Sequence, residues 1–236
     1  MLILAVDCAT PAAGIAISDG EKIKVEYSLN SQGPHSANFM PMIDKCLQDC
    51  GCSLKDLDAI AITSGPGSFT GIRIGMATVK GLSLASGVPI IAISTLEALA
   101  FNLVLSDYLV CPVLNARKNE VYTAAYDVRG LKPGILWGPA ACSPQVMAEA
   151  AKDFAEHRPG VVLLGDGLKP YREIFHTALG SKLIEVPPHF MLPRAGSIAD
   201  LAMIKLKQGD FEDVHKIRPY YIRLSEAEYK LGKGER

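Results

Sequence analysis

The sequence has no excess of basic residues: 24 Lys and Arg residues are offset by 25 Asp and Glu residues, for a formal net charge of −1. A protein that grips a nucleic-acid backbone by itself usually carries surplus positive charge. Strong, direct binding of RNA or DNA is therefore not expected of the isolated chain, although a partner protein could supply that charge.

Long apolar runs and paired cysteines are also absent. No stretch of 18 apolar residues occurs, and residues 1–6 form a short run with no basic start, so the sequence predicts a cytoplasmic protein without membrane contact. None of the six cysteines belongs to a Cys-x-x-Cys pair, which favours free thiols. Cys46, Cys50 and Cys52 could converge on a soft metal, but no His pair accompanies them and we expect no bound metal.

Three familiar catalytic motifs are missing. After the glycine-rich stretch, Gly71 is followed by Ile72 and Arg73 instead of the Lys-Ser/Thr of a Walker P-loop, and the Rossmann glycine spacing fails as well. There is no His-Glu-x-x-His pattern for a zinc peptidase. The sequence thus points away from these common classes of nucleotide-binding protein and metalloenzyme.

What is present is the composition of an α/β protein, with 49% hydrophobic, 21% charged and 7% aromatic residues. In the first half, apolar runs and helical spacing alternate. They predict strands at 2–6, 14–17, 22–29, 59–63 and 89–93, and helices at 35–50, 72–85 and 94–105. This order places an antiparallel meander beside parallel strands crossed by helices.

The second half repeats this order imperfectly. It predicts strands at 109–114, 120–127, 131–137 and 161–164, and helices at 143–157, 168–178 and 195–207. We therefore expect two similar lobes, each a mixed sheet flanked by helices. The expected boundaries are 1–104 for the N-terminal lobe, 105–218 for the C-terminal lobe and 219–236 for a frayed tail.

The strongest local signal is the glycine-rich stretch 65–75 between a buried strand and a helix. It has two interpretations: backbone N–H groups and a helix N-terminus that hold an anion, or a tight turn in which glycine relieves crowding. The short motif at 165–167 repeats the pattern in the second half. Candidates for binding an anion or a nucleotide phosphate are Asp7, Gly65, Gly67, Ser68, Gly165 and Gly167.

Seven short blocks of this sequence resemble one known family over essentially the whole chain. They are residues 4–7, 14–17, 35–36, 64–75, 115–122, 165–167 and 219–223. The chain resembles the TsaB (YeaZ) family, whose two-lobed fold is shared by actin, sugar kinases and Hsp70. The family is a non-catalytic relative of TsaD, the subunit that transfers threonylcarbamoyl to the adenosine beside the anticodon of certain tRNAs.

The resemblance also implies an absence of catalysis. Thr95 and Leu99 occupy the positions of the His-x-x-x-His pair that binds a metal in TsaD, and neither can replace an imidazole. Pro11 occupies the position of an acidic residue of that relative. We therefore expect no catalytic residue, no metal and no cofactor beyond weak nucleotide binding. Asn115 departs from the Asp that commonly opens the family's Asp-Ala-Arg motif, which puts a charge-dependent role there in doubt.

The implied partners are a TsaD-like catalytic subunit and, through it, a TsaE-like ATPase, with a homodimer when the chain is alone and tRNA bound only within the complex. Because the helix predicted at 72–85 is apolar around its circumference, one sheet cannot cover it. The interface candidates are Phe39, Ile43, Cys46, Ile72, Met76, Val79, Lys80 and Ser83. The alternatives are an ATP-dependent small-molecule kinase or ATPase of the same fold, and a metallopeptidase-like protein.

Overall fold

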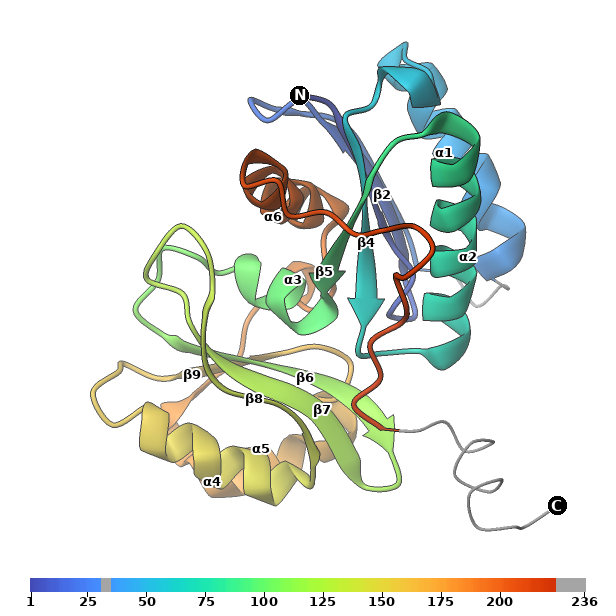
Figure 1. Ribbon diagram of the computed structural model, residues 1–236. Helices are drawn as coiled ribbons and strands as arrows, with labels where there is room; N and C mark the ends of the chain where they lie inside the picture. Colours follow the sequence, from blue (N-terminus) through green and yellow to red (C-terminus); the bar gives the residue numbers. More distant parts are fainter. Residues whose placement is uncertain (31–34, 224–236) are drawn as a thin grey trace, which may run out of the picture.

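The computed structural model describes residues 1–30 and 35–223, with the side chains of residues 35–37 left out. Its two lobes are each built on a five-stranded sheet (Figure 1). The N-terminal sheet has the order β3-β2-β1-β4-β5. Its strands are β1 (Ile3–Asp7), β2 (Ala13–Ser18), β3 (Ile23–Leu29), β4 (Ala59–Gly65) and β5 (Ile90–Ser94). β1 pairs antiparallel with β2 and parallel with β4, as the predicted order requires.

The two faces of this sheet are covered by different helices, so β1 and β4 are buried throughout. Helices α1 (His35–Cys50) and α2 (Phe69–Ser86) cover one face, and α3 (Thr95–Phe101) and α6 (Ala195–Lys207) pack against the other (Figure 1). Helix α2 begins at the N-cap Ser68, and it ends at Gly87 in the left-handed conformation, where glycine carries no Cβ penalty.

The C-terminal sheet repeats the order of the first one, as β8-β7-β6-β9-β10. Its strands are β6 (Leu109–Arg117), β7 (Glu120–Asp127), β8 (Gly134–Cys142), β9 (Val161–Leu164) and β10 (Leu183–Ile184). Helices α4 (Pro144–Phe154) and α5 (Arg172–Leu179) cover one face. Short 3-10 helices lie at Leu54–Asp56, Lys169–Tyr171, Gly180–Lys182 and Pro188–Phe190. The prediction of two lobes, each with a mixed sheet and flanking helices, is confirmed.

Helix α3 joins the two lobes. Its Ala98 packs with Ile91 and Ile93 of the N-terminal sheet, and its Leu96 and Leu99 pack with the inner face of the C-terminal sheet. The lobe junction is therefore an apolar core shared by both sheets. Within the described residues, no helix is both long and apolar enough to cross a membrane.

The predicted lobe boundaries are wrong at the C-terminal end. The predicted C-terminal lobe, 105–218, includes α6, but α6 lies against the N-terminal sheet, where Ile198 and Leu201 join the core formed by Ile3 and Ala5. Ile217 is also buried in the N-terminal lobe. The chain thus returns to its first lobe after completing the second, and residues 219–223 of the predicted tail are packed rather than frayed. Residues 224–236 lie outside the described part.

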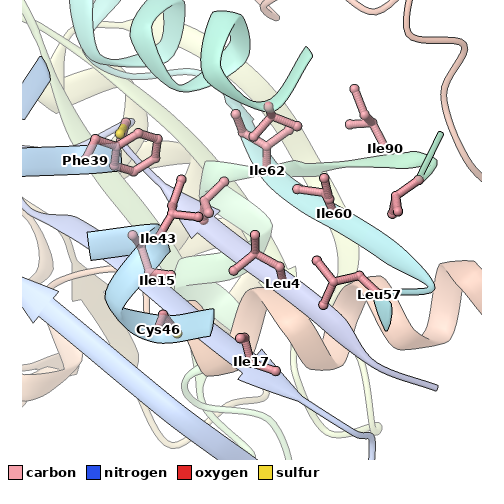
Figure 2. Packing of buried hydrophobic residues seen from close by; sticks show 14 of the residues in the cluster. Leu4, Ile15, Ile17, Phe39, Ile43, Cys46, Leu57, Ile60, Ile62 and Ile90 are labelled. Carbon is pink, nitrogen blue, oxygen red and sulfur yellow. The ribbon is translucent and has the colours of Figure 1, made fainter. Parts of the chain in front are cut away.

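The predicted interface side chains on α1 and α2 face the sheet instead of a partner. Figure 2 shows Phe39, Ile43 and Cys46 of α1 directed toward β1 and β2, and each is at most 1% exposed. On α2 the buried members of the prediction are Ile72, Met76, Val79 and Ser83. Lys80 is half-buried, and its Nζ donates a hydrogen bond to the Ile217 carbonyl at 3.3 Å.

The reason is a difference in side-chain size around α2. Most of its large apolar residues recur at positions that face the sheet, whereas the outward side carries the small Ala77 and Gly81 and one large apolar residue, Leu84. An apolar circumference therefore did not mean that the large side chains were left uncovered, and the prediction that they form an interface is wrong.

Candidate functional site

The glycine loop, residues 65–71, packs directly against the turn between β1 and β2. A Cβ placed on Gly67 would lie 2.1 Å from the carbonyl oxygen of Ala9, and one on Gly71 would lie 2.0 Å from that of Cys8. The Ser68 amide donates a hydrogen bond to the Ala9 carbonyl at 2.8 Å. These glycines allow two backbone segments to touch, which is the structural interpretation of the motif.

The other end of the loop makes a similar contact. Gly65 has φ +124°, and a Cβ there would lie 2.4 Å from the carbonyl oxygen of Tyr220. The Tyr220 amide donates to the Ser64 carbonyl at 2.8 Å. The hydroxyl of Ser68 accepts from the Gly71 amide at 3.2 Å and so caps α2. Contacts within the chain thus account for these residues, and anion binding by Gly65, Gly67 and Ser68 stays a prediction.

Asp7 organises the turn against which the loop packs. Its buried carboxylate accepts hydrogen bonds from the Ala9 amide at 3.0 Å, from the Thr10 hydroxyl at 3.4 Å and from the Thr63 hydroxyl of β4. A buried carboxylate is tolerated where such donors surround it. Asp7 therefore ties β1, β4 and the turn together, and its role in binding an anion or a nucleotide stays a prediction.

The second glycine loop, residues 165–167, uses the same device in the other lobe. A Cβ on Gly165 would lie 2.3 Å from the Val113 carbonyl oxygen, and the Gly167 amide donates to that same carbonyl at 3.0 Å. Between them, Asp166 accepts from the Asn115 amide at 3.0 Å. Burial raises the pKa of Asp166, and the hydrogen bond from the Asn115 amide opposes this shift.

A cavity of about 510 Å³ lies between the lobes. Its walls come from the β1–β2 turn, the glycine loop, the β6–β7 hairpin, the second glycine loop and the C-terminal segment. The lining residues are Ala9, Thr10, Pro11, Gly67, Ser68, Phe69, Thr70, Leu114, Asn115, Ala116, Arg117, Lys118, Tyr122, Asp166 and Arg223. Of the predicted anion-binding residues, Gly67 and Ser68 line the cavity, and the other four lie in the strands and turns that support its walls.

The β6–β7 hairpin presents two cations to this cavity through an unusual backbone. Arg117, Lys118 and Asn119 all have positive φ, at 60°, 52° and 60°. A two-residue hairpin turn of type I′ requires positive φ at both central residues, here Lys118 and Asn119, and a bulge lies beside Arg117. Such conformations cost about 1 kcal/mol or more for each residue that is not glycine. The hairpin therefore holds Arg117 and Lys118 at the cavity wall at some cost.

Asn115 stabilises that hairpin without needing a charge. Its side-chain oxygen accepts from the Arg117 amide at 2.8 Å, a role that Asp would perform equally well. The Asn in place of the family's usual Asp therefore leaves this contact intact.

Sequence reasoning missed Arg223 as a residue of the site. Arg223 lines the cavity and pairs with Glu120 of β7, although the sequence predicted only a frayed tail there. The sequence did contain one signal for this segment, because residues 219–223 form one of the blocks that resemble the TsaB family. The resemblance block 35–36 begins α1, and its side chains lie outside the described residues.

The two positions at which the resemblance predicts no metal ligand lie in the apolar interior. Thr95 and Leu99 are fully buried, and Leu99 packs in the apolar junction between the lobes. Cys46 is buried, and burial raises its pKa to about 12 and that of Cys52 to about 11. All six cysteines are free. Among the described residues, no group of three or more His, Cys, Asp or Glu side chains is placed to hold a metal ion.

The class of protein is defined by two features. The two lobes repeat one strand order, and a glycine loop from each lobe forms a wall of the cavity between them. The protein has the two-lobed fold that the resemblance implied, with a mixed sheet and flanking helices in each lobe.

Comparisons with known proteins identify the family within this class. The family model described as "TsaD: tRNA N6-adenosine threonylcarbamoyltransferase" matches residues 30–231. The protein named "tRNA threonylcarbamoyladenosine biosynthesis protein TsaB" from Bacillus subtilis is 33% identical over 98% of this chain and 97% of its own length. The protein of the same name from Escherichia coli is 30% identical over 98% of both chains. The chain therefore belongs to the TsaB (YeaZ) family, within the broader family of TsaD.

A solved structure agrees with this assignment. The structure titled "YeaZ from Pseudomonas aeruginosa" superimposes with a TM-score of 0.79 at 26% identity, covering 93% of this chain and 99% of that one. The likeness thus extends through both lobes.

Proposed function

We propose that the protein is an accessory subunit in the biosynthesis of threonylcarbamoyladenosine in tRNA, and that it pairs with a TsaD-like catalytic subunit. Membership of the TsaB family supports the pathway, because the relatives from B. subtilis and E. coli carry that pathway in their names. The observation that carries the pairing is the uncovered outer face of α2.

That outer face is well suited to another helix. Ala77 and Gly81 are exposed one turn apart, and Leu84 follows with 60% of its surface exposed. Small residues let a second helix approach closely, and a flanking exposed Leu supplies apolar area to bury. Helix α1 lies beside α2 on the same side of the sheet, so both present outward faces (Figure 1).

The subunit is proposed to be non-catalytic. Thr95 and Leu99 offer no metal ligand, and Pro11, at the cavity wall, offers no carboxylate. Catalysis would then reside in the partner, a TsaE-like ATPase would join through that partner, and tRNA would bind only to the assembled complex.

The proposal extends to the chain on its own. There the outer faces of α1 and α2 would pair with a second copy and form a homodimer. The cavity would bind a nucleotide weakly at most, and no cofactor is required. The cytoplasmic location expected from the sequence stays a prediction.

Matched charge substitutions on two helices test the pairing. Leu84→Asp places a charge on the outer face of α2, and Val146→Asp is the control, because Val146 is a 54% exposed apolar residue on α4. Association with the TsaD-like protein of the same organism is measured by isothermal titration calorimetry, and folding by circular dichroism. Leu84→Asp should weaken association about 30-fold or more, which corresponds to the ~2 kcal/mol of an interface hot spot. Val146→Asp should change it little.

Equal affinities for the two variants would place the interface elsewhere. Modification assays with tRNA complete the test: the chain alone should show no turnover, and the complex with Leu84→Asp should lose activity in proportion to its lost affinity. Robust turnover by the purified chain would refute the accessory role.

A further inference from the structure

Residues 219–223, here called the strap, lead from the N-terminal lobe to the C-terminal lobe (Figure 1). Just before the strap, Ile217 is buried in the N-terminal core, and its carbonyl accepts from Lys80 Nζ of α2. At its start, the Tyr220 amide donates to the Ser64 carbonyl at 2.8 Å. The strap is thus anchored to the N-terminal lobe by backbone contacts beside the glycine loop.

The middle of the strap stacks on the start of α2. The ring of Tyr221 lies 4.9 Å from that of Phe69, and its hydroxyl accepts a hydrogen bond from Arg73 Nε at 2.8 Å. The Arg73 guanidinium also lies 5.5 Å from the centre of the Tyr221 ring and 5.9 Å from that of Phe69. Aromatic and cation–π contacts of this kind hold the strap on the outer end of the glycine loop.

The end of the strap reaches the other lobe. Ile222 packs against the apolar core that includes Leu114 and Tyr122, and Arg223 forms an ion pair with Glu120 at the start of β7. Both Arg223 and Phe69 line the cavity between the lobes. Five residues therefore connect the glycine loop in one lobe to the β6–β7 hairpin in the other, along the cavity wall.

The strap differs in kind from the junction at α3. The α3 junction is an apolar core, which neither salt nor a single charge change dissolves. The strap reaches the second lobe through one partly buried apolar side chain, Ile222, and through an ion pair whose two side chains are each about one-third exposed, at 33% and 36%. Such a pair is weakened by salt and by loss of either charge.

We propose that the strap is a latch that sets the separation of the lobes at the cavity, with α3 as the fixed apolar joint. Closing the latch places Arg223 beside Glu120 and holds the β6–β7 hairpin near the glycine loop. Opening it frees the hairpin side of the C-terminal lobe to swing away about α3, which widens the cavity. The proposal concerns this chain alone and does not rest on its place in a complex.

The test measures the distance between the lobes in the full-length chain. Nitroxide labels are attached through keto amino acids at two exposed positions, Gln48 of α1 and Glu149 of α4. The distance distribution is measured by double electron–electron resonance. Glu120→Arg and Arg223→Glu each replace the attraction by a repulsion, and the double variant restores an ion pair of reversed polarity. Arg129→Glu, which breaks the Asp127–Arg129 pair within one lobe, is the control.

The latch predicts one narrow distance for the unmodified chain and for Arg129→Glu. Each single reversal should add a population at longer distance, high salt should do so partly, and the double variant should return to the single distance. Hydrogen exchange of residues 217–223 reports separately whether the strap is released. Release of the strap with an unchanged distance distribution would overturn the proposal, as would single variants whose strap stays protected. If a reversal prevents folding, Arg223→Met removes the charge with less disruption and is judged by the same two outcomes.

Discussion

Two glycine-to-alanine substitutions in the same helix should change stability in opposite directions. Gly71 and Gly81 both lie within α2 with ordinary helical φ, and alanine at such positions normally stabilises a helix by about 0.5–1 kcal/mol. Gly81 has no atom within 4 Å of the position where a Cβ would stand. Gly81→Ala should therefore raise the free energy of unfolding by about 0.5–1 kcal/mol.

Gly71→Ala should do the reverse. Its Cβ would lie 2.0 Å from the carbonyl oxygen of Cys8 and 3.2 Å from the carbonyl carbon. These are backbone atoms of the β1–β2 turn, so no rotation of a side chain relieves the clash, and the helix and the turn have to separate. We expect a loss of about 3 kcal/mol, at the upper end of overpacking effects.

Gly75→Ala is the intermediate case. Its Cβ would meet the Cδ1 of Ile62 at 3.2 Å and the Cβ of Cys8 at 3.3 Å, contacts that shifts of a few tenths of an ångström relieve. Its effect should fall between those of the other two variants.

Urea unfolding of the isolated chain at low concentration, followed by circular dichroism, measures all three variants. In a thermal unfolding experiment on a chain of this size, each kcal/mol of change in the free energy of unfolding corresponds to a shift of about 2–4 °C in Tm. The reasoning is refuted if Gly71→Ala is as stable as Gly81→Ala, because the loop would then not rest on the turn as described.

Three further outcomes are expected. Val79→Ala, which truncates a fully buried side chain of α2, should lower the free energy of unfolding by about 2–3 kcal/mol. An effect near zero in the same urea assay would indicate that Val79 lies at the surface. Ser68→Ala removes the cap of α2 and should cost about 1 kcal/mol, whereas Ser68→Asp, which keeps an acceptor, should cost less. Hydrogen bonds from Arg129, and secondarily from Arg158, hold the pKa of Asp127 well below its usual value of 3.8. The ionised Asp127 stabilises the folded chain at every pH above its usual pKa, the value it has in the unfolded chain. This stabilisation is lost as the pH falls from that value through the lower pKa of the folded chain. Asp127→Asn should therefore be less stable than the unmodified chain at pH 7. That deficit should shrink in unfolding measurements below about pH 3.8, and a deficit independent of pH would contradict this account.

Much of the architecture could be predicted from the sequence, because the spacing of apolar residues along the chain determines the type and order of the elements. The buried runs of β1 and β4, the helical spacing in α1 and the repeated order of elements together predicted two lobes with mixed sheets. Details at element ends were less accurate: β8 begins at Gly134 where a strand was predicted from 131, α3 ends at Phe101 where a helix was predicted to 105, and β10 was not predicted. Ends depend on caps and tertiary contacts that periodicity does not encode.

The candidate site was only partly predictable, and so was the role of α2. The glycine loops were found, but what they contact was not, since the partners of Gly67 and Gly71 are the distant Ala9 and Cys8. Helical periodicity also cannot assign an inner and an outer side to a helix that is apolar all round. The sequence favoured Val79 for a partner, and the fold placed it in the core.

What the sequence determined by itself is the set of elements, their repetition and the family, because these follow from spacing along the chain. The tertiary structure alone decided that α6 returns to the N-terminal sheet and that Arg223 reaches Glu120 across the cavity. These contacts join residues far apart in sequence. Their free energy depends on which surfaces remain uncovered once both sheets have formed, and no local pattern records that.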